Sequence, residues 1–229
     1  MPSVDLETTS LRSLNQLLHG LGEGTNETYF RIANPRGRHA VAVGLDAPVT
    51  VEIDGNVGYY CAGMNARATV IVNGSAGVGV AENMMSGRVH VKGDAGASAG
   101  ASGCGGLLVI DGNASGRCGI SARGIEIVVK GSVGHMSAFM AQAGTLVVLG
   151  DAGDALGDSI YEARLFVRGG VKSLGADCIE KPVSDQHKCG LGKLLEEAGI
   201  GGEVDPAEFR RYGSARKLYH FHMDNLEAY

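Results

Sequence analysis

A glycine recurs every 19 residues along the middle of the chain, within residues 49–172. The seven positions of this glycine column are Gly55, Gly74, Gly93, Gly112, Gly131, Gly150 and Gly169. Two and four residues before each of these glycines the chain carries Val, Ile or Leu, as Ile53 and Val51 precede Gly55. Copies of one short pattern at a fixed period are typical of stacked units, each too small to bury its own apolar residues. The repeat therefore predicts a solenoid.

Each repeat begins apolar–x–apolar–x–Gly, a pattern that is typical of a short strand whose alternate side chains point inward. Glycine permits close approach of the backbone, which stacked identical corners require. At one strand spacing per coil, seven coils would form a rod of roughly 33 Å. We therefore expect a mainly β fold, a single-stranded parallel β-helix of about seven 19-residue coils, right-handed as parallel crossover connections are by default.

Residues 1–48 fit the 19-residue register poorly, and we expect them to form an N-terminal cap over the open end of the sheet. Apolar spacing predicts an amphipathic helix over residues 5–20, with Ser10 able to cap its start. An extended segment over 28–32 and a short strand over 40–43 should complete this cap.

The repeat fails after residue 172, and residues 173–229 are predicted to form a helical and extended C-terminal docking tail. A helix is expected over 188–198, with leucines on one face. A second helix is expected to start at 205–208, where Asp, Pro and Glu occupy favourable first-turn positions. Phe209 and Tyr212 would anchor this second helix.

The residue between the two inward apolar positions of each repeat should point outward. In the last four coils this outer column reads Val109, Val128, Val147 and Phe166. A parallel sheet that is apolar on both faces is normally covered on both. Either the chain's own tail or another subunit could cover this column. We treat these four residues as candidate interface residues, together with Arg216, Tyr219 and Phe221 of the aromatic, partly basic C-terminal arm.

Composition excludes several classes of function. A net charge of −5 argues against nucleic-acid binding, which calls for a basic surface. No apolar run approaches the roughly 20 residues of a membrane span, and the N-terminus lacks the pattern of a secretory signal. The five cysteines are odd in number and contain no C-x-x-C pair, so we expect reduced thiols in a cytoplasmic protein.

The sequence contains no established catalytic or metal-binding motif. Cys178, His187 and Cys189 could in principle converge on zinc, but their spacing matches no known ligand pattern. His220 and His222 are more readily explained as a packed or exposed pair than as metal ligands. A carbohydrate-cleaving β-helix needs clustered carboxylates, usually on long loops that a strict period does not leave room for. We therefore expect no catalytic, cofactor-binding or metal-binding residue on this chain.

Several stretches resemble a known family. The repeat G-x-x-G-x-x-x-G, intact at Gly93, Gly96 and Gly100, is similar to the G-x-G-x-G β-helix domain of the glutamate synthase family. Four further stretches resemble the free-standing β-helix subunit found with N-methylglutamate synthase: GYYCAGMN at 58–65, AENMMSG at 81–87, GDSIYEA at 157–163 and YGSARKLY at 212–219.

This resemblance implies a non-catalytic scaffold subunit in a hetero-oligomeric complex that converts methylamine and glutamate to N-methylglutamate and ammonia. The implied partners are a class II glutamine amidotransferase-like subunit and an FMN-binding subunit that also carries iron–sulfur clusters. The chain begins Met1-Pro2 rather than with the nucleophilic cysteine of the amidotransferase, and it has no iron–sulfur cysteine run. The alternatives are a β-helix subunit of ordinary glutamate synthase or of formylmethanofuran dehydrogenase, and a stand-alone β-helix hydrolase.

Overall fold

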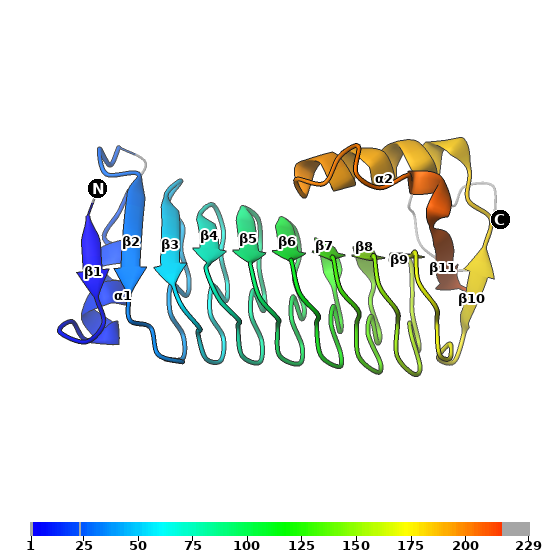
Figure 1. The fold of residues 1–229 in the computed structure, drawn as a ribbon, viewed down its shortest axis with the longest axis horizontal. Coiled ribbons are helices and arrows are strands. Elements are labelled where there is room, and N and C mark those ends of the chain that lie inside the picture. Colours follow the sequence, from blue (N-terminus) through cyan, green and yellow to red (C-terminus); the bar gives the residue numbers. More distant parts are fainter. Residues whose placement is uncertain (1, 23, 217–229) are drawn as a thin grey trace.

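The structure, a computed structural model, describes residues 2–22 and 24–216. These residues form eleven strands of one sheet, in the order β1-β2-β3-β4-β5-β6-β7-β8-β9-β11-β10. The strands stack side by side along the long axis of the molecule (Figure 1). Strands β3 to β9 carry the repeat and span Thr50–Asp54, Thr69–Val72, Arg88–Val91, Leu107–Ile110, Arg123–Val129, Ala143–Val148 and Arg164–Val167. The predicted parallel β-helix is confirmed.

Adjacent strands pair in the register that the repeat predicts. Val51 lies beside Val70, and Val70 lies beside Val89, so equivalent residues of successive coils are neighbours in the sheet. Beyond each corner, a single bridge such as that between Val57 and Ala76 continues this register. The inward columns are buried and form the main core, because alternate residues of a strand face the same side.

The glycine column lies where each strand ends and the chain turns. A Cβ atom on Gly131 would lie 2.6 Å from the carbonyl oxygen of Gly112 and 2.5 Å from Oδ1 of Asn113. The amide of Gly131 also donates to the carbonyl of Gly112 at 3.0 Å. Glycine is therefore required at this corner because consecutive coils approach closely. Within the glycine column a left-handed backbone occurs at Gly55, where φ is 129°.

Left-handed residues instead alternate with ordinary ones in the loop that follows each corner. Gly79, Ala81 and Asn83 have φ values of 71°, 56° and 56°, and the equivalent positions of the neighbouring coils repeat this pattern. The amide of Ala81 donates to Cys61 of the preceding coil at 2.9 Å, whereas that of Asn83 donates to Ala101 of the next coil at 2.8 Å. Hydrogen bonds to both neighbouring coils offset a conformation that costs about 1–2 kcal/mol per non-glycine residue.

At the N-terminal end, β1 (Ser3–Asp5), α1 (Leu11–His19) and β2 (Tyr29–Ala33) precede the repeat. The helix is shorter than the predicted 5–20, and Ser10 caps it by accepting from the amide of Ser13 at 3.1 Å. The extended segment over 28–32 is present as β2. The strand predicted over 40–43 is wrong: these residues form a turn, in which Ala40 and Ala42 have left-handed φ values of 54° and 56°.

The stack of parallel strands continues into the N-terminal region. Phe30 of β2 lies beside Val51, which is 21 residues further along the chain. A search at a period of 19 therefore does not detect this coil. Strand β1 pairs in parallel with β2 and forms the first edge of the sheet.

At the C-terminal end, the chain reverses direction to close the sheet. Strand β10 (Cys178–Lys181) is followed by α2 (Asp185–Glu197), a short 3₁₀ helix (Pro206–Glu208) and β11 (Arg210–Ser214). Strand β11 pairs antiparallel with both β9 and β10. Helix α2 begins three residues earlier than predicted, because Ser184 caps it through the amide of His187.

The second predicted helix is reduced to the one 3₁₀ turn at Pro206–Glu208. Phe209 and Tyr212 are buried, but Tyr212 lies in β11, where it pairs with Leu165. The first-turn signals at 205–208 are therefore present, and pairing with β9 prevents the helix from continuing. Neither α1 nor α2, the two α-helices among the described residues, is long and apolar enough to cross a membrane.

We predict that Gly131→Ala lowers the melting temperature, because the added methyl group would meet the backbone of Gly112. Overpacking of this kind typically costs about 1–3 kcal/mol of unfolding free energy. Gly190→Ala is the matched control: it lies within α2, and its Cβ would meet nothing within 4 Å. The control should be neutral or stabilising by about 0.5–1 kcal/mol. Thermal unfolding of both variants checks this, and equal effects would contradict the role of the corner.

Candidate functional site

The apolar outer column lies beneath the chain's own helix. Helix α2 extends over the outer face of β6 to β9 (Figure 1). The four column residues are 0%, 0%, 0% and 3% exposed, in the order Val109, Val128, Val147 and Phe166. They pack with the apolar face of α2, which includes Leu191, Leu194 and Leu195. The sequence left open whether the chain's own tail or another subunit covers this column. The structure shows that the chain's own tail covers it.

Of the remaining candidate interface residues, only Arg216 belongs to the part of the chain that the structure describes. Arg216 forms an ion pair with Asp177, just after the end of β11. Tyr219 and Phe221 lie outside the described residues, as do His220 and His222.

The zinc arrangement considered from the sequence is not formed. Cys178 is buried in β10, and burial raises its thiol pKa to about 11. Cys189 is exposed on α2, and the ring of His187 lies 2.8 Å from the hydroxyl of Ser184. Within residues 2–22 and 24–216, no group of three His, Cys, Asp or Glu side chains could hold a metal ion. The five cysteines are all free thiols.

A polar network joins His90 of β5 to the residues that directly follow β6 and β7. Asp111 accepts hydrogen bonds from Lys130 at 2.7 Å and from His90 at 3.0 Å. Burial lowers the pKa of His90, which favours the neutral imidazole. Burial raises the pKa of Asp111, but the contacts with Lys130 and His90 outweigh this, so its pKa is lowered overall. These groups satisfy one another, and we assign them a structural role.

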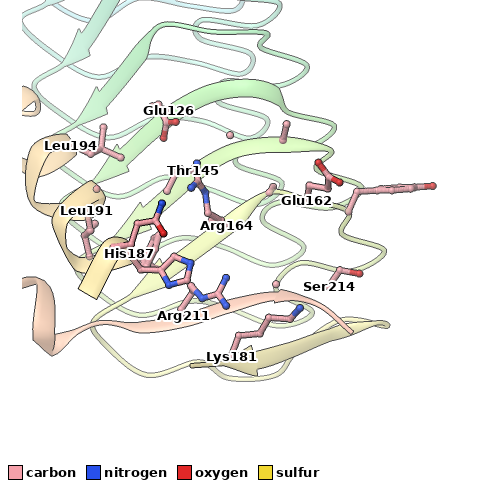
Figure 2. Close-up of a pocket in the computed structure, with 18 of the residues that line it drawn as sticks. Glu126, Thr145, Glu162, Arg164, Lys181, His187, Leu191, Leu194, Arg211 and Ser214 are labelled. Carbon is pink, nitrogen blue, oxygen red and sulfur yellow. The ribbon is translucent and has the colours of Figure 1, made fainter. Parts of the chain in front are cut away.

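A cavity of about 800 Å³ lies between α2 and the outer face of the sheet from β7 to β11 (Figure 2). Its floor carries Glu126 of β7, Arg164 of β9, Arg211 of β11 and Lys181 of β10. Phe166, Leu191 and Leu194 form part of its apolar wall. A site of this size, with an apolar wall and a few convergent polar groups, is typical of pockets for small ligands. We call it the α2 cavity.

The α2 cavity contains a buried carboxylate with an unsatisfied oxygen. Oε2 of Glu126 is inaccessible and has no hydrogen-bond partner among the described residues. Burial raises the pKa of this carboxyl group, and the negative charge of Glu197 adds to the shift, whereas Thr145 and Arg164 oppose it. Burial of an unpaired charge favours the protonated form.

None of the charged residues of the α2 cavity was predicted as a site residue from the sequence. Glu126, Thr145 and Arg164 occupy one outward column, two residues before Val128, Val147 and Phe166. The sequence therefore did carry a signal for Glu126 and Arg164, because these charged side chains lie beside the apolar outer column, which must be covered. Lys181 and Arg211 gave no such signal, because the antiparallel pairing that brings them together is not part of the repeat.

Glycine-cornered parallel coils, covered on one outer face by their own C-terminal helix, place this chain in the class of parallel β-helix proteins. The chain belongs to the family of Protein GlxC from Rhizobium meliloti (strain 1021), with which it is 65% identical over 229 residues, covering 100% of both chains.

A solved structure extends the comparison. The chain is similar to a chain of the formyltransferase/hydrolase complex (FhcABCD) from Methylorubrum extorquens in complex with methylofuran, with a TM-score of 0.69 and 26% identity. The match covers 86% of this chain and 84% of that one. No protein-family model matches the sequence.

We predict that Leu195→Ala in α2 lowers the unfolding free energy by about 2–5 kcal/mol, as expected for truncation of a buried leucine. Leu195 is 1% exposed within the cluster beneath α2. The control is Leu17→Ala, at a leucine of α1 that is 47% exposed and should cost far less. Denaturant titration of both variants provides the measurement, and equal losses would show that α2 contributes little to stability.

We also predict a pH-dependent effect of Glu126→Gln. The folded-state pKa of Glu126 is raised, so its protonated form stabilises the fold below the unfolded pKa, and this contribution is lost as pH rises through the folded pKa. Gln keeps the shape without the charge. The melting temperature of the variant should therefore exceed that of wild type at pH 7.5 by more than at pH 4. Glu196→Gln, at an exposed position of α2, is the control. A difference that does not change with pH would contradict the prediction.

Proposed function

We propose that this chain is the non-catalytic scaffold subunit of an N-methylglutamate synthase, which converts methylamine and glutamate to N-methylglutamate and ammonia. The observation that carries the proposal is the β-helix match, over 86% of this chain, to a chain of a multi-subunit enzyme complex. The stretches at 58–65, 81–87, 157–163 and 212–219, which resemble the free-standing subunit of that enzyme, support the finer assignment.

In the proposed complex, the chemistry belongs to the partners. A class II glutamine amidotransferase-like subunit and a subunit carrying FMN and iron–sulfur clusters would each bind the scaffold. A rigid stack suits this task, because coils that bond to both neighbours hold distant surfaces at a fixed separation. Beside the α2 cavity, Ser184 and His187 form the capping box of α2, in which the His187 ring accepts from the amide of Ser184 at 3.1 Å, and we assign this pair to the helix cap.

Exposed apolar side chains on the loops offer contact surface for such partners. Tyr59 is 58% exposed and Val78 is 42% exposed, at equivalent positions of adjacent coils. Met64 and Met85 are also exposed on neighbouring coils. These side chains would contact a partner in the proposed complex, and methionine adapts readily to a partner surface.

A second candidate is the equivalent β-helix subunit of a different complex, either ordinary glutamate synthase or formylmethanofuran dehydrogenase. The similarity to a chain of the formyltransferase/hydrolase complex supports this second candidate. The scaffold role is the same in both candidates, and the acceptor substrate distinguishes them.

The test is co-expression of the chain with the amidotransferase-like and FMN-binding subunits encoded in the same organism. We expect the three to co-elute from a sizing column, and N-methylglutamate to form from methylamine and glutamate when all three are present. Mixtures lacking one subunit serve as controls. Elution of this chain alone from the full mixture would refute the scaffold role. Co-elution without methylamine turnover would favour the second candidate.

A further inference from the structure

Three cationic side chains meet at one end of the α2 cavity. Lys181 lies directly opposite Arg211 across the antiparallel pair of β10 and β11, and Arg211 lies opposite Phe166 of β9. Side chains directly opposite in a sheet share a face, so Lys181 and Arg211 project together beside Phe166. Arg164, two residues before Phe166, lines the same cavity (Figure 2).

None of these three side chains forms an ion pair with a described carboxylate. Residues 2–22 and 24–216 provide no ion pair to Arg164, Lys181 or Arg211. Burial and the adjacent Arg211 lower the pKa of Lys181, and burial and Arg164 lower the pKa of Arg211. Like charges directly opposite in a sheet are destabilising, so the cluster costs stability when it holds no anion.

Other charged side chains also line the cavity, but none of them pairs with the cluster. Arg216 is paired with Asp177, and Glu126, whose pKa Arg164 lowers, lies on the far side of Thr145 from Arg164. The carboxylates of Glu162 and Glu197 belong to the same lining. Arg211 is oriented by one hydrogen bond, from Nε to the carbonyl of Pro182 at 3.0 Å. That contact leaves the two terminal nitrogens of the guanidinium available to a ligand.

We propose that Arg164, Lys181 and Arg211 form a binding site for the carboxylate or phosphate group of a small anionic molecule that enters the α2 cavity. The planar guanidinium fork of an arginine matches two oxygens of either group, and the lysine adds a third, flexible donor. The cavity, at about 800 Å³, can hold a molecule of metabolite size, and its apolar wall would contact the remainder of that molecule. The proposal does not depend on which complex the chain belongs to.

Calorimetric titration of the purified full-length chain at low ionic strength tests the site, with inorganic phosphate and succinate as separate probes. The probe that binds more tightly identifies the preferred oxyanion. Arg211→Gln and Lys181→Gln should each weaken that binding about tenfold or more, as loss of a charge-assisted hydrogen bond predicts. Arg12→Gln removes the same charge from the exposed face of α1 at the other end of the rod, and should change the affinity less than twofold.

Folding of each variant is checked by its melting temperature, which should stay equal or rise because a like charge has been removed. If Arg211→Gln is unstable, Arg211→Lys keeps the charge without the fork and should still weaken binding. Failure of wild type to bind either anion at millimolar concentration would overturn the proposal. So would equal weakening by Arg12→Gln. If wild type binds neither probe and Arg211→Gln abolishes co-elution with a partner subunit, the cluster docks an acidic group of that partner, and the small-ligand site is wrong.

Discussion

Close approach of consecutive coils at the glycine corners sets the spacing on which the rest of this structure depends. Gly131 lies so near Gly112 that no side chain fits between them. Because every coil repeats this contact, each strand meets its neighbour in the same register, and the inward columns stack into one continuous core. The loops depend on the same spacing, since left-handed residues such as Ala81 are held by hydrogen bonds to neighbouring coils.

The constant backbone leaves the outward side chains free to differ, and they divide the outer face into two parts. His90 of β5 is followed in the same column by Val109 of β6. Around the border between these parts, His90 of β5 bonds to Asp111, the residue that follows β6. From β6 onward, apolar residues lie beneath α2. The helix thus covers the part of the column in which apolar residues follow one another without interruption, from Val109 to Phe166.

The repeat itself carried enough information to predict the fold, the register and the need for a cover, because each depends on local spacing. Elements that depend on distant pairing were not predictable in this way. Tyr212 follows a good helix start, yet it joins a strand because β9 offers an open edge. Residues 40–43 have strand-forming side chains but occupy a left-handed loop of a coil with 21 residues. The cationic end of the α2 cavity was missed for a similar reason, since Lys181 and Arg211 become neighbours through the chain reversal.

That reversal has two separable consequences. Antiparallel pairing of β11 with β9 covers the last strand of the stack, which any strand of suitable length could do. The pairing of Lys181 with Arg211 is not needed to cover the last strand, and the repulsion between their two positive charges destabilises the pairing of β10 with β11. A neutral polar residue at either position would close the sheet at lower cost. The charges therefore need an explanation beyond the fold, and an anion held between α2 and the sheet supplies one, because it would turn mutual repulsion into shared attraction.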